Sequence, residues 1–347
     1  MSLSAPFPWF GGKSRAAHLV WAALGDVNGY VEPFAGSLAV LLARPTVRGV
    51  ETVNDRDAYL ANFWRALRHE PDAVAHHADW PVSEVDLSAR HLWLVNEGRA
   101  VLDRMAADPD AYDAKIAGWW VWGLCSWIGS GWCSGEGPWV RGDDGLLNRK
   151  IPHLGDAGRG VNRKIPHLGD AGRGVNRKIP HLGNAGRGVN RQIPHLGDAG
   201  QGVHGSASTQ EWMRSLSTRL RGVRIACGDW TRIMGPSVLR AGGGKCGVLL
   251  DPPYVTGEDL YAEAGDGVCH EVFRWAEEHG DDSSLRIVVC GYEGDWSPPA
   301  GWKTVPWKAR RAFNSKNDGS RERLWCSPAC LTVEPAQRGL ELHAEAL

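Results

Sequence analysis

The feature that most restricts how this chain can fold is a tandem repeat in its middle. Residues 148–203 consist of four copies of a 14-residue unit, which reads NRKIPHLGDAGRGV in the first two copies. Each copy contains one proline and three glycines, and these exclude a continuous helix. Each copy also contains too few apolar residues to bury a core of its own. We therefore expect a flexible loop or a stack of short turns that interrupts the surrounding fold.

The repeats also concentrate positive charge. The first two copies carry +2 each, the third +3 and the fourth zero, so the segment carries +7, whereas the whole chain carries −1. The remaining residues therefore sum to −8. A basic segment rich in arginine and glycine, in an otherwise acidic protein, commonly binds phosphate groups. The alternative is that the repeats are a solvated linker.

Cysteine spacing and hydropathy argue against a zinc protein, a membrane protein and a secreted protein. The eight cysteines include no CxxC pair and no histidine spacing typical of a zinc site, so we expect reduced thiols and no metal. No segment reaches the roughly 18–20 apolar residues that span a membrane. Residues 1–9 lack the charged start and the apolar run of a signal peptide. We therefore expect a soluble cytoplasmic protein without a membrane partner.

On both sides of the repeats, short apolar segments end in polar or turn-forming residues and alternate with helical patterns. Strands are expected at 29–31, 47–53, 224–227, 247–250, 286–290 and 324–326, with helices starting near 38 and covering 58–67. This alternation indicates the α/β class, with a doubly wound, mainly parallel, Rossmann-like sheet. Residues 70–125 have the apolar spacing of helices. Together with the repeats, they appear as an insertion in the sheet domain.

Ligands of open parallel sheets bind beyond the carboxyl ends of the strands, so the residues there are candidate site residues. Glu32 to Gly36 follow the first expected strand, where glycine lets the backbone approach a ligand and where an ordinary turn is the alternative. Asp55 ends the second strand, where an acid commonly accepts hydrogen bonds from a ribose; a helix N-cap is the alternative. Asp229 and Trp230 follow a third strand and could grip and cover an adenine, or form a structural turn.

The most specific motif is Asp251, Pro252, Pro253, Tyr254, directly after three apolar residues. The exocyclic amine of a purine is a poor nucleophile because its lone pair is delocalised into the ring. A carboxylate and a backbone carbonyl that accept hydrogen bonds from this amine would pull its nitrogen toward tetrahedral geometry. Asp251 and Pro252 suit these roles, and the ring of Tyr254 suits stacking on a base removed from the duplex. A catalytic role is favoured over a structural one.

Taken together, these motifs resemble the Dam-like, DPPY-type adenine-N6 DNA methyltransferases, which use S-adenosylmethionine. The resemblance covers most of the chain, in the order expected of that group. Residues 9–13 are similar to its WxGGK opening and residues 32–40 to its EPFxGxGxV motif; Asn54 and Asp55, residues 228–230, the DPPY motif, Tyr261, His270 and residues 321–327 follow. The resemblance implies a Rossmann-like methyltransferase sheet with an inserted, mainly helical target-recognition region.

The resemblance also implies a catalytic set and a methyl-donor site. The catalytic set is Asp251, Pro252, Pro253 and Tyr254. The donor site comprises Trp9, Lys13, Glu32, Phe34, Gly36, Asp55, Asp229, Trp230 and Asp251. One position departs from the family, because Leu38 stands where a second glycine is usual. Its larger side chain would crowd the methionine end of the donor.

In this family, DNA is recognised by the region between the donor site and DPPY. Six of the 18 tryptophans lie within residues 119–139 of this region, and such a cluster is more often core than a stacking surface for bases. The repeats resemble an expanded recognition loop. Its candidate DNA-binding residues, expected to contact mainly phosphates, are Arg149, Lys150, Arg159, Arg163, Lys164 and Arg173.

The implied organisation has four parts. Residues 1–69 and 205–335 form the catalytic domain, 70–147 the recognition region, 148–203 the repeats and 336–347 a tail. A monomer is compatible with this organisation, and the near-identical repeats resemble those of phage-encoded genes.

We expect a site-specific enzyme that methylates N6 of adenine in double-stranded DNA after base flipping, as in restriction-modification. One alternative is a relative that modifies RNA or another amine. Another is a non-catalytic protein that binds nucleic acid through the basic repeats. The intact DPPY motif, Lys13 and Asp55 favour the enzyme.

Overall fold

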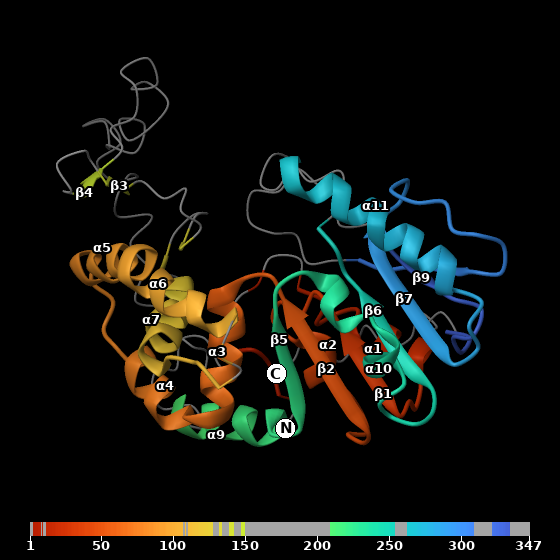
Figure 1. Ribbon diagram of the computed structural model, residues 1–347, viewed down its shortest axis with the longest axis horizontal. Helices are drawn as coiled ribbons and strands as arrows, with labels where there is room; N and C mark the ends of the chain where they lie inside the picture. The colour runs from red at the N-terminus through yellow and green to blue at the C-terminus, as the bar shows by residue number, and fades with distance from the viewer. Residues whose placement is uncertain are drawn as a thin grey trace, which may run out of the picture. The chain divides into compact units, whose positions relative to one another are not determined.

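The computed structural model divides the chain into two compact units (Figure 1). The described residues are 3–7, 9, 12–106, 108, 110–127, 132–133, 139–141, 147–149, 209–253, 262–308 and 321–333. The first unit comprises residues 1–4, 9–56 and 222–347, and the second comprises residues 5–8 and 57–221. Nearly all of the repeats and the tail after residue 333 lie outside the described residues, so the expectations for them stay predictions.

The first unit is built on a seven-stranded sheet. Its strands are β1 (Gly29–Glu32), β2 (Val50–Asp55), β5 (Val223–Cys227), β6 (Cys246–Leu250), β7 (Leu285–Tyr292), β8 (Lys303–Pro306) and β9 (Glu322–Cys326). They lie in the order β5-β2-β1-β6-β7-β9-β8. All neighbouring strands are parallel except β9, which is antiparallel to β7 and β8. The expected α/β class with a mainly parallel, Rossmann-like sheet is confirmed.

Helices cover both faces of this sheet. They are α1 (Ala17–Leu24), α2 (Ala39–Leu42), α10 (Pro236–Leu239) and α11 (Ala262–His279), and Figure 1 shows α11 lying across the sheet. Side chains of a strand alternate between the two faces. Val248 and Leu250 of β6 therefore share a buried cluster with Val272 of α11. On the opposite face, a Cβ atom added to Gly247 would lie 3.2 Å from Leu24 of α1.

The order of the strands reverses between β1 and β6. The chain passes from β1 to β2 and β5 on one side, and from β6 to β7 on the other. Gly29 is opposite Cys246 and Val31 is opposite Val248, so the carboxyl ends of the two strands lie together. This is the position at which open α/β sheets bind their ligands.

The second unit is mainly helical, which confirms the expectation for residues 70–125. Its helices are α3 (Ala58–His69), α4 (Pro71–Ala78), α5 (Glu84–Trp93), a π-helical turn (Leu94–Gly98), α6 (Arg99–Leu102), α7 (Ala114–Ser126) and α9 (Thr209–Leu220); β3 (Trp139–Arg141) pairs with β4 (Leu147–Arg149). Side chains of Asp57, Ser83 and Asp113 cap α3, α5 and α7. The helices α3 and α9, which the sequence placed in the sheet domain, group with this unit because they pack on α4 and α7.

The core of the helical unit is aromatic. The ring centroid of Phe7 lies 5.4 Å from that of Phe63, 5.6 Å from that of Trp64 and 5.4 Å from that of Trp120. Trp120 and Trp122 of α7 are buried. Large aromatic rings bury more apolar surface than other side chains. The interpretation of the clustered tryptophans as core residues is confirmed for Trp120, Trp122 and Trp132, whereas Trp119 and Trp127 are half-buried.

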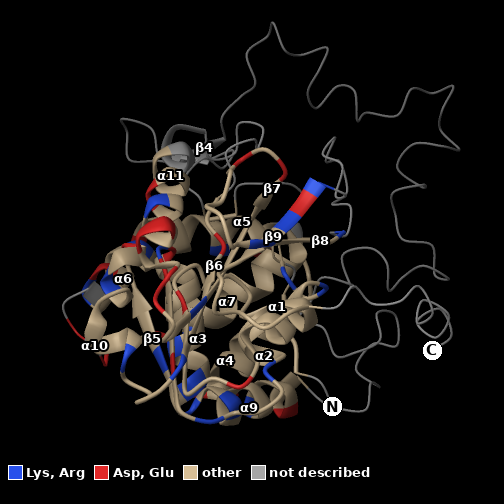
Figure 2. Ribbon diagram, turned by 90° about the vertical axis from the view of Figure 1, so that its right-hand side faces the viewer, with Lys and Arg blue, Asp and Glu red and all other residues tan. Residues whose placement is uncertain are grey.

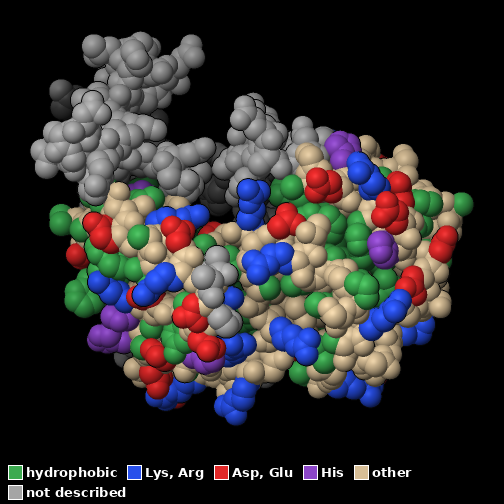
Figure 3. Space-filling model, viewed as in Figure 1, with side chains coloured by type: hydrophobic (Ala, Val, Ile, Leu, Met, Phe, Trp, Pro, Cys, Tyr) green, Lys and Arg blue, Asp and Glu red, His purple; other side chains and the backbone are tan. Residues whose placement is uncertain are grey.

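Charged side chains of both signs are interspersed on the described surface. Figure 3 shows them mixed with apolar side chains over one face, and Figure 2 shows acidic and basic residues on the same helices. On the face that Figure 3 shows, acidic side chains lie at several separate places among basic ones. Among the described residues, no helix is both long enough and apolar enough to cross a membrane.

Candidate active site

An ion pair lies beside the carboxyl end of β6. The Nζ atom of Lys13 lies 2.9 Å from Oδ1 of Asp251, and their side chains are 5% and 19% exposed. Lys13 also lies 5.8 Å from the ring centroid of Trp307. Burial alone would lower the pKa of Lys13, but the charges of Asp251 and Glu322 outweigh it and raise this pKa above its ordinary value. Lys13 is therefore a permanent cation that orients the carboxylate of Asp251.

Glu32, the last residue of β1, is a buried carboxyl group. The hydroxyl group of Tyr30 donates a hydrogen bond of 3.0 Å to its Oε2 atom. Burial raises the pKa of Glu32 to about 8; the Tyr30 hydrogen bond opposes this rise, whereas the charges of Asp251 and Asp55 add to it. Glu32 is therefore mostly protonated at neutral pH.

Gly36 shapes the turn that follows β1. Its N–H donates a hydrogen bond of 3.0 Å to Oδ2 of Asp55. It has a φ of 47°, and a Cβ atom there would lie 2.6 Å from Nε1 of Trp9, so glycine lets this indole approach the turn. The alternative that Asp55 caps α3 is wrong, because Asp57 accepts the hydrogen bond from the N–H of Tyr59 and is that cap.

Asn54 connects the carboxyl ends of three strands. Its Nδ2 atom donates hydrogen bonds of 3.1 Å to the carbonyl of Pro33 and 3.0 Å to the carbonyl of Gly228. These residues follow β1 and β5, while Asn54 lies in β2. The side chain is 1% exposed. It thereby joins the loops that carry the candidate donor-site residues.

Asp229 forms the structural turn that was the alternative to a ligand contact. It accepts hydrogen bonds from the N–H and hydroxyl groups of Thr231 and caps a short helix over residues 230–233. Trp230 is 5% exposed and stacks on Phe34, with ring centroids 6.0 Å apart. The ring of Trp230 therefore belongs to the core, whereas Phe34 is half-buried and keeps an exposed surface.

Leu38 has an unusual backbone at the start of α2. Its φ of 55° and ψ of 24° are left-handed, a conformation that favours glycine. Its side chain is fully buried. A side chain without exposed surface does not project into an open site, and this argues against the expected crowding of a donor.

The candidate residues after Asp251 are described in part. Pro252 is buried and Pro253 exposed. The residues outside the described part are Phe10, Gly11, Tyr254 and Tyr261, and the basic residues Lys150, Arg159, Arg163, Lys164 and Arg173. Arg149 ends β4, where only the backbone is described. Roles for these side chains stay predictions.

Sequence reasoning did not assign Tyr30, Trp307 or Glu322 to the site. Tyr30 lies two positions before Glu32 in a strand, and alternate residues share a face, so this neighbour was detectable. Trp307 directly follows β8 and Glu322 begins β9, far from Lys13 in the sequence. Such long-range contacts leave no local signal.

The site residues from the N-terminal part of the chain lie in a segment that matches a protein-family model. No curated protein matches the chain. Residues 9–81, which include Lys13, Glu32, Gly36 and Asp55, match the family model of the D12 class N6 adenine-specific DNA methyltransferases.

Proposed function

We propose that this protein transfers a methyl group from S-adenosylmethionine to N6 of adenine in double-stranded DNA. The observation that carries the proposal is the ion pair between Lys13 and Asp251. Lys13 belongs to the segment that matches the methyltransferase family, whereas Asp251 opens the DPPY motif outside it. The pair joins two independent indications of the same chemistry at the switch point of the sheet.

The charges of the site suit a cationic donor. The carboxyl group of Glu32 interacts with those of Asp55 and Asp251, while the ammonium group of Lys13 is paired with Asp251. S-adenosylmethionine supplies its methyl group from a positively charged sulfonium. The half-buried ring of Phe34 offers an apolar surface for the adenosine part. The indole of Trp9 packs against the turn at Gly36, whose N–H donates to Asp55.

Asp251 and Pro252 prepare the acceptor. The carboxylate of Asp251 and the carbonyl of Pro252 accept hydrogen bonds from the N6 amine of a flipped adenine, which localises the lone pair of the nitrogen. Lys13 fixes the orientation of the carboxylate. Tyr254 provides the stacking face in this proposal. Asp251 is therefore the catalytic residue, and Lys13 is its positioning residue.

DNA binding is assigned to the helical unit and the repeats. Phosphate contacts by the arginines and lysines of the repeats give affinity that falls with salt. Base contacts from the same region give site specificity. The near identity of the copies favours phosphate contacts for most of them, because identical units cannot all face the same few base pairs.

The test is methyl transfer by the purified protein from methyl-labelled S-adenosylmethionine to unmethylated double-stranded DNA. Asp251→Asn should lower the rate by at least about 100-fold while donor binding persists, because the amide is a weaker acceptor for the amine. Asp282→Asn is the matched control, since Asp282 accepts hydrogen bonds from Ser284 within an exposed turn of the same unit. An unchanged rate in Asp251→Asn would contradict the mechanism. Transfer to RNA but not to DNA would contradict the substrate.

A further inference from the structure

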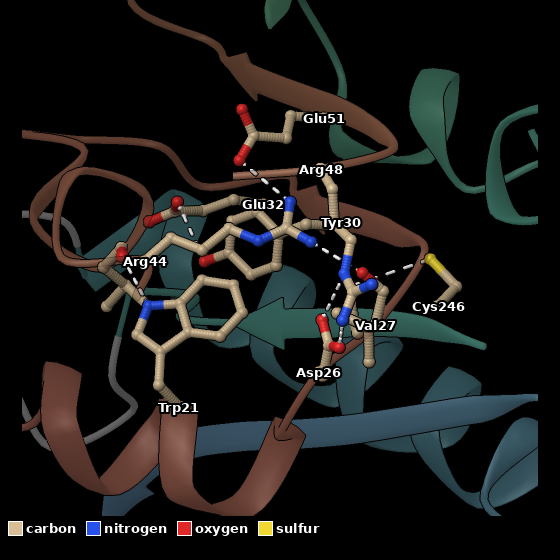
Figure 4. Close-up of polar contacts among 11 residues, drawn as sticks. Trp21, Asp26, Val27, Tyr30, Glu32, Arg44, Arg48, Glu51 and Cys246 are labelled. Atoms are coloured by element: carbon tan, nitrogen blue, oxygen red, sulfur yellow. Dashed lines mark hydrogen bonds and ion pairs between the residues drawn. The ribbon is translucent and has the colours of Figure 1, made fainter. Parts of the chain in front are cut away.

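A buried polar cluster supports Glu32 from the side opposite α11. Figure 4 shows Tyr30 pointing its hydroxyl group at Glu32, with Trp21 of α1 beside it. The ring centroids of Trp21 and Tyr30 lie 4.8 Å apart. Trp21 is itself fixed by a hydrogen bond of 2.7 Å from its Nε1 atom to the carbonyl of Val40. Tyr30 therefore has little freedom to move away from Glu32.

Arg44 completes this cluster (Figure 4). Its guanidinium lies 5.3 Å from the ring centroid of Trp21, donates to Oε1 of Glu51 at 2.9 Å and donates to the carbonyl of Val27 at 2.6 Å. The side chains of Arg44 and Glu51 are 2% and 5% exposed. A paired, hydrogen-bonded and buried cation of this kind is a rigid support. The residues of this cluster therefore come from β1, β2, α1 and the segment directly after α2.

The charges around Glu32 set its protonation. The titratable groups that act on Glu32 or on its partner Tyr30 are Asp251 after β6, Asp55 and Glu51 of β2, Cys290 of β7 and, through Asp251, Lys13. Lys13 is engaged with Asp251. The carboxylates next to Glu32 repel a second negative charge, and burial removes the water that would solvate it. With its pKa raised to about 8, Glu32 is mostly protonated at neutral pH.

We propose that Tyr30 is a positioning residue that holds Glu32 as a proton-exchanging cation receptor of the donor site. When the positively charged methyl donor enters, the carboxyl group of Glu32 releases its proton to solvent and the resulting carboxylate balances the charge of the donor. The hydroxyl group of Tyr30 stabilises that carboxylate by its hydrogen bond. This inference rests on the proposed function, because it takes the sulfonium-bearing donor as the ligand.

The inference predicts that donor binding is linked to proton release. Below pH 8, donor affinity should rise about tenfold per pH unit, and it should level off above this pH. Removing the hydroxyl of Tyr30 removes a stabiliser of the carboxylate, so the plateau should move to higher pH. The donor KM at pH 7 should then rise several-fold while kcat at saturating donor stays close to that of the wild type.

The test is calorimetric titration of the full-length protein with S-adenosylmethionine in two buffers of different ionisation enthalpy. When the donor binds at pH 7, the wild type should release about 0.9 proton more than Glu32→Gln. Subtracting the value for Glu32→Gln removes the protons that the donor itself exchanges. Tyr30→Phe should bind more weakly at pH 7 and recover its affinity near pH 9. Tyr112→Phe is the matched control, because the hydroxyl of Tyr112 also donates to a glutamate, Glu70, at 2.9 Å, but on the exposed surface of the helical unit.

Three results would overturn the inference. The wild type and Glu32→Gln could release equal numbers of protons. Tyr30→Phe, folded as judged by circular dichroism, could have the pH profile of the wild type, or lose affinity equally at every pH as a purely structural role would predict. Absence of donor binding by the wild type would overturn the proposed function as well, and this outcome is distinct from binding without proton release.

Discussion

The left-handed backbone of Leu38 makes a sharp prediction about stability. Leu38 has a φ of 55° and is fully buried, whereas Leu41 is fully buried three positions later inside α2. Replacing either leucine with alanine removes buried surface and should cost about 2–5 kcal/mol. The informative comparison is between alanine and glycine at each position.

Glycine has the same two disadvantages relative to alanine at both positions. Glycine has more conformational entropy in the unfolded chain, and it lacks the methyl group that alanine buries. Together these effects make the glycine variant about 1–2 kcal/mol less stable than the alanine variant. At position 38 glycine also relieves left-handed strain, worth about 1–2 kcal/mol. Leu38→Gly should therefore match or exceed Leu38→Ala in stability, while Leu41→Gly should be clearly less stable than Leu41→Ala.

The assay is urea denaturation of the four variants. Unfolding is monitored by circular dichroism, and the free energies of unfolding are compared for the same unfolding transition. The difference in free energy of unfolding between the glycine and the alanine variant should change by about 1–2 kcal/mol between positions 38 and 41. Equal differences at positions 38 and 41 would refute the left-handed assignment. Tighter binding of S-adenosylmethionine by Leu38→Gly would instead revive the idea that this leucine crowds the donor.

Three further predictions concern other parts of the molecule. Burial lowers the pKa of His91, so the free energy of unfolding should fall as pH drops below the unfolded-state pKa of 6.5, by at most about 1.4 kcal/mol per pH unit. In denaturation measured between pH 7 and 5, His91→Phe should make the free energy of unfolding less dependent on pH. Gly36→Ala should abolish donor binding, because its Cβ atom would meet an indole at 2.6 Å, whereas Gly235→Ala has open space and should bind normally in the same titration. Arg44→Met should cost about 3–5 kcal/mol by leaving Glu51 buried without its cation, and thermal melts should show much of the loss restored when Glu51→Leu is added.

The local pattern of the sequence was sufficient for most of the sheet. β6 and β7 are short apolar runs buried on both faces, and this is what a central parallel strand requires. β8 was not expected, because its residues 303–306 are mostly exposed and end in Pro306, as an edge strand permits. The grouping of α3 with the helical unit was also missed, since an amphipathic pattern does not say which neighbour covers its apolar face.

The candidate site was predictable where function constrains residues near a strand end. Asp251 and Glu32 were identified in this way, and their strands end side by side. The ion pair of Lys13 with Asp251 depends on three-dimensional placement, which spacing along the chain does not contain. The turn made by Asp229 is local, and it was the alternative that the sequence offered. The protonation of Glu32 depends on burial and on like charges from other strands, so it required the structure.

The most direct test of the central claim is nucleoside mass spectrometry of plasmid DNA from a methylation-deficient host. The host would express either the wild-type protein or Asp251→Ala at equal soluble levels. Our account predicts N6-methyladenine in the DNA with the wild type and none with Asp251→Ala. Equal amounts of N6-methyladenine with both proteins, or its absence with a soluble wild type that binds S-adenosylmethionine, would contradict it.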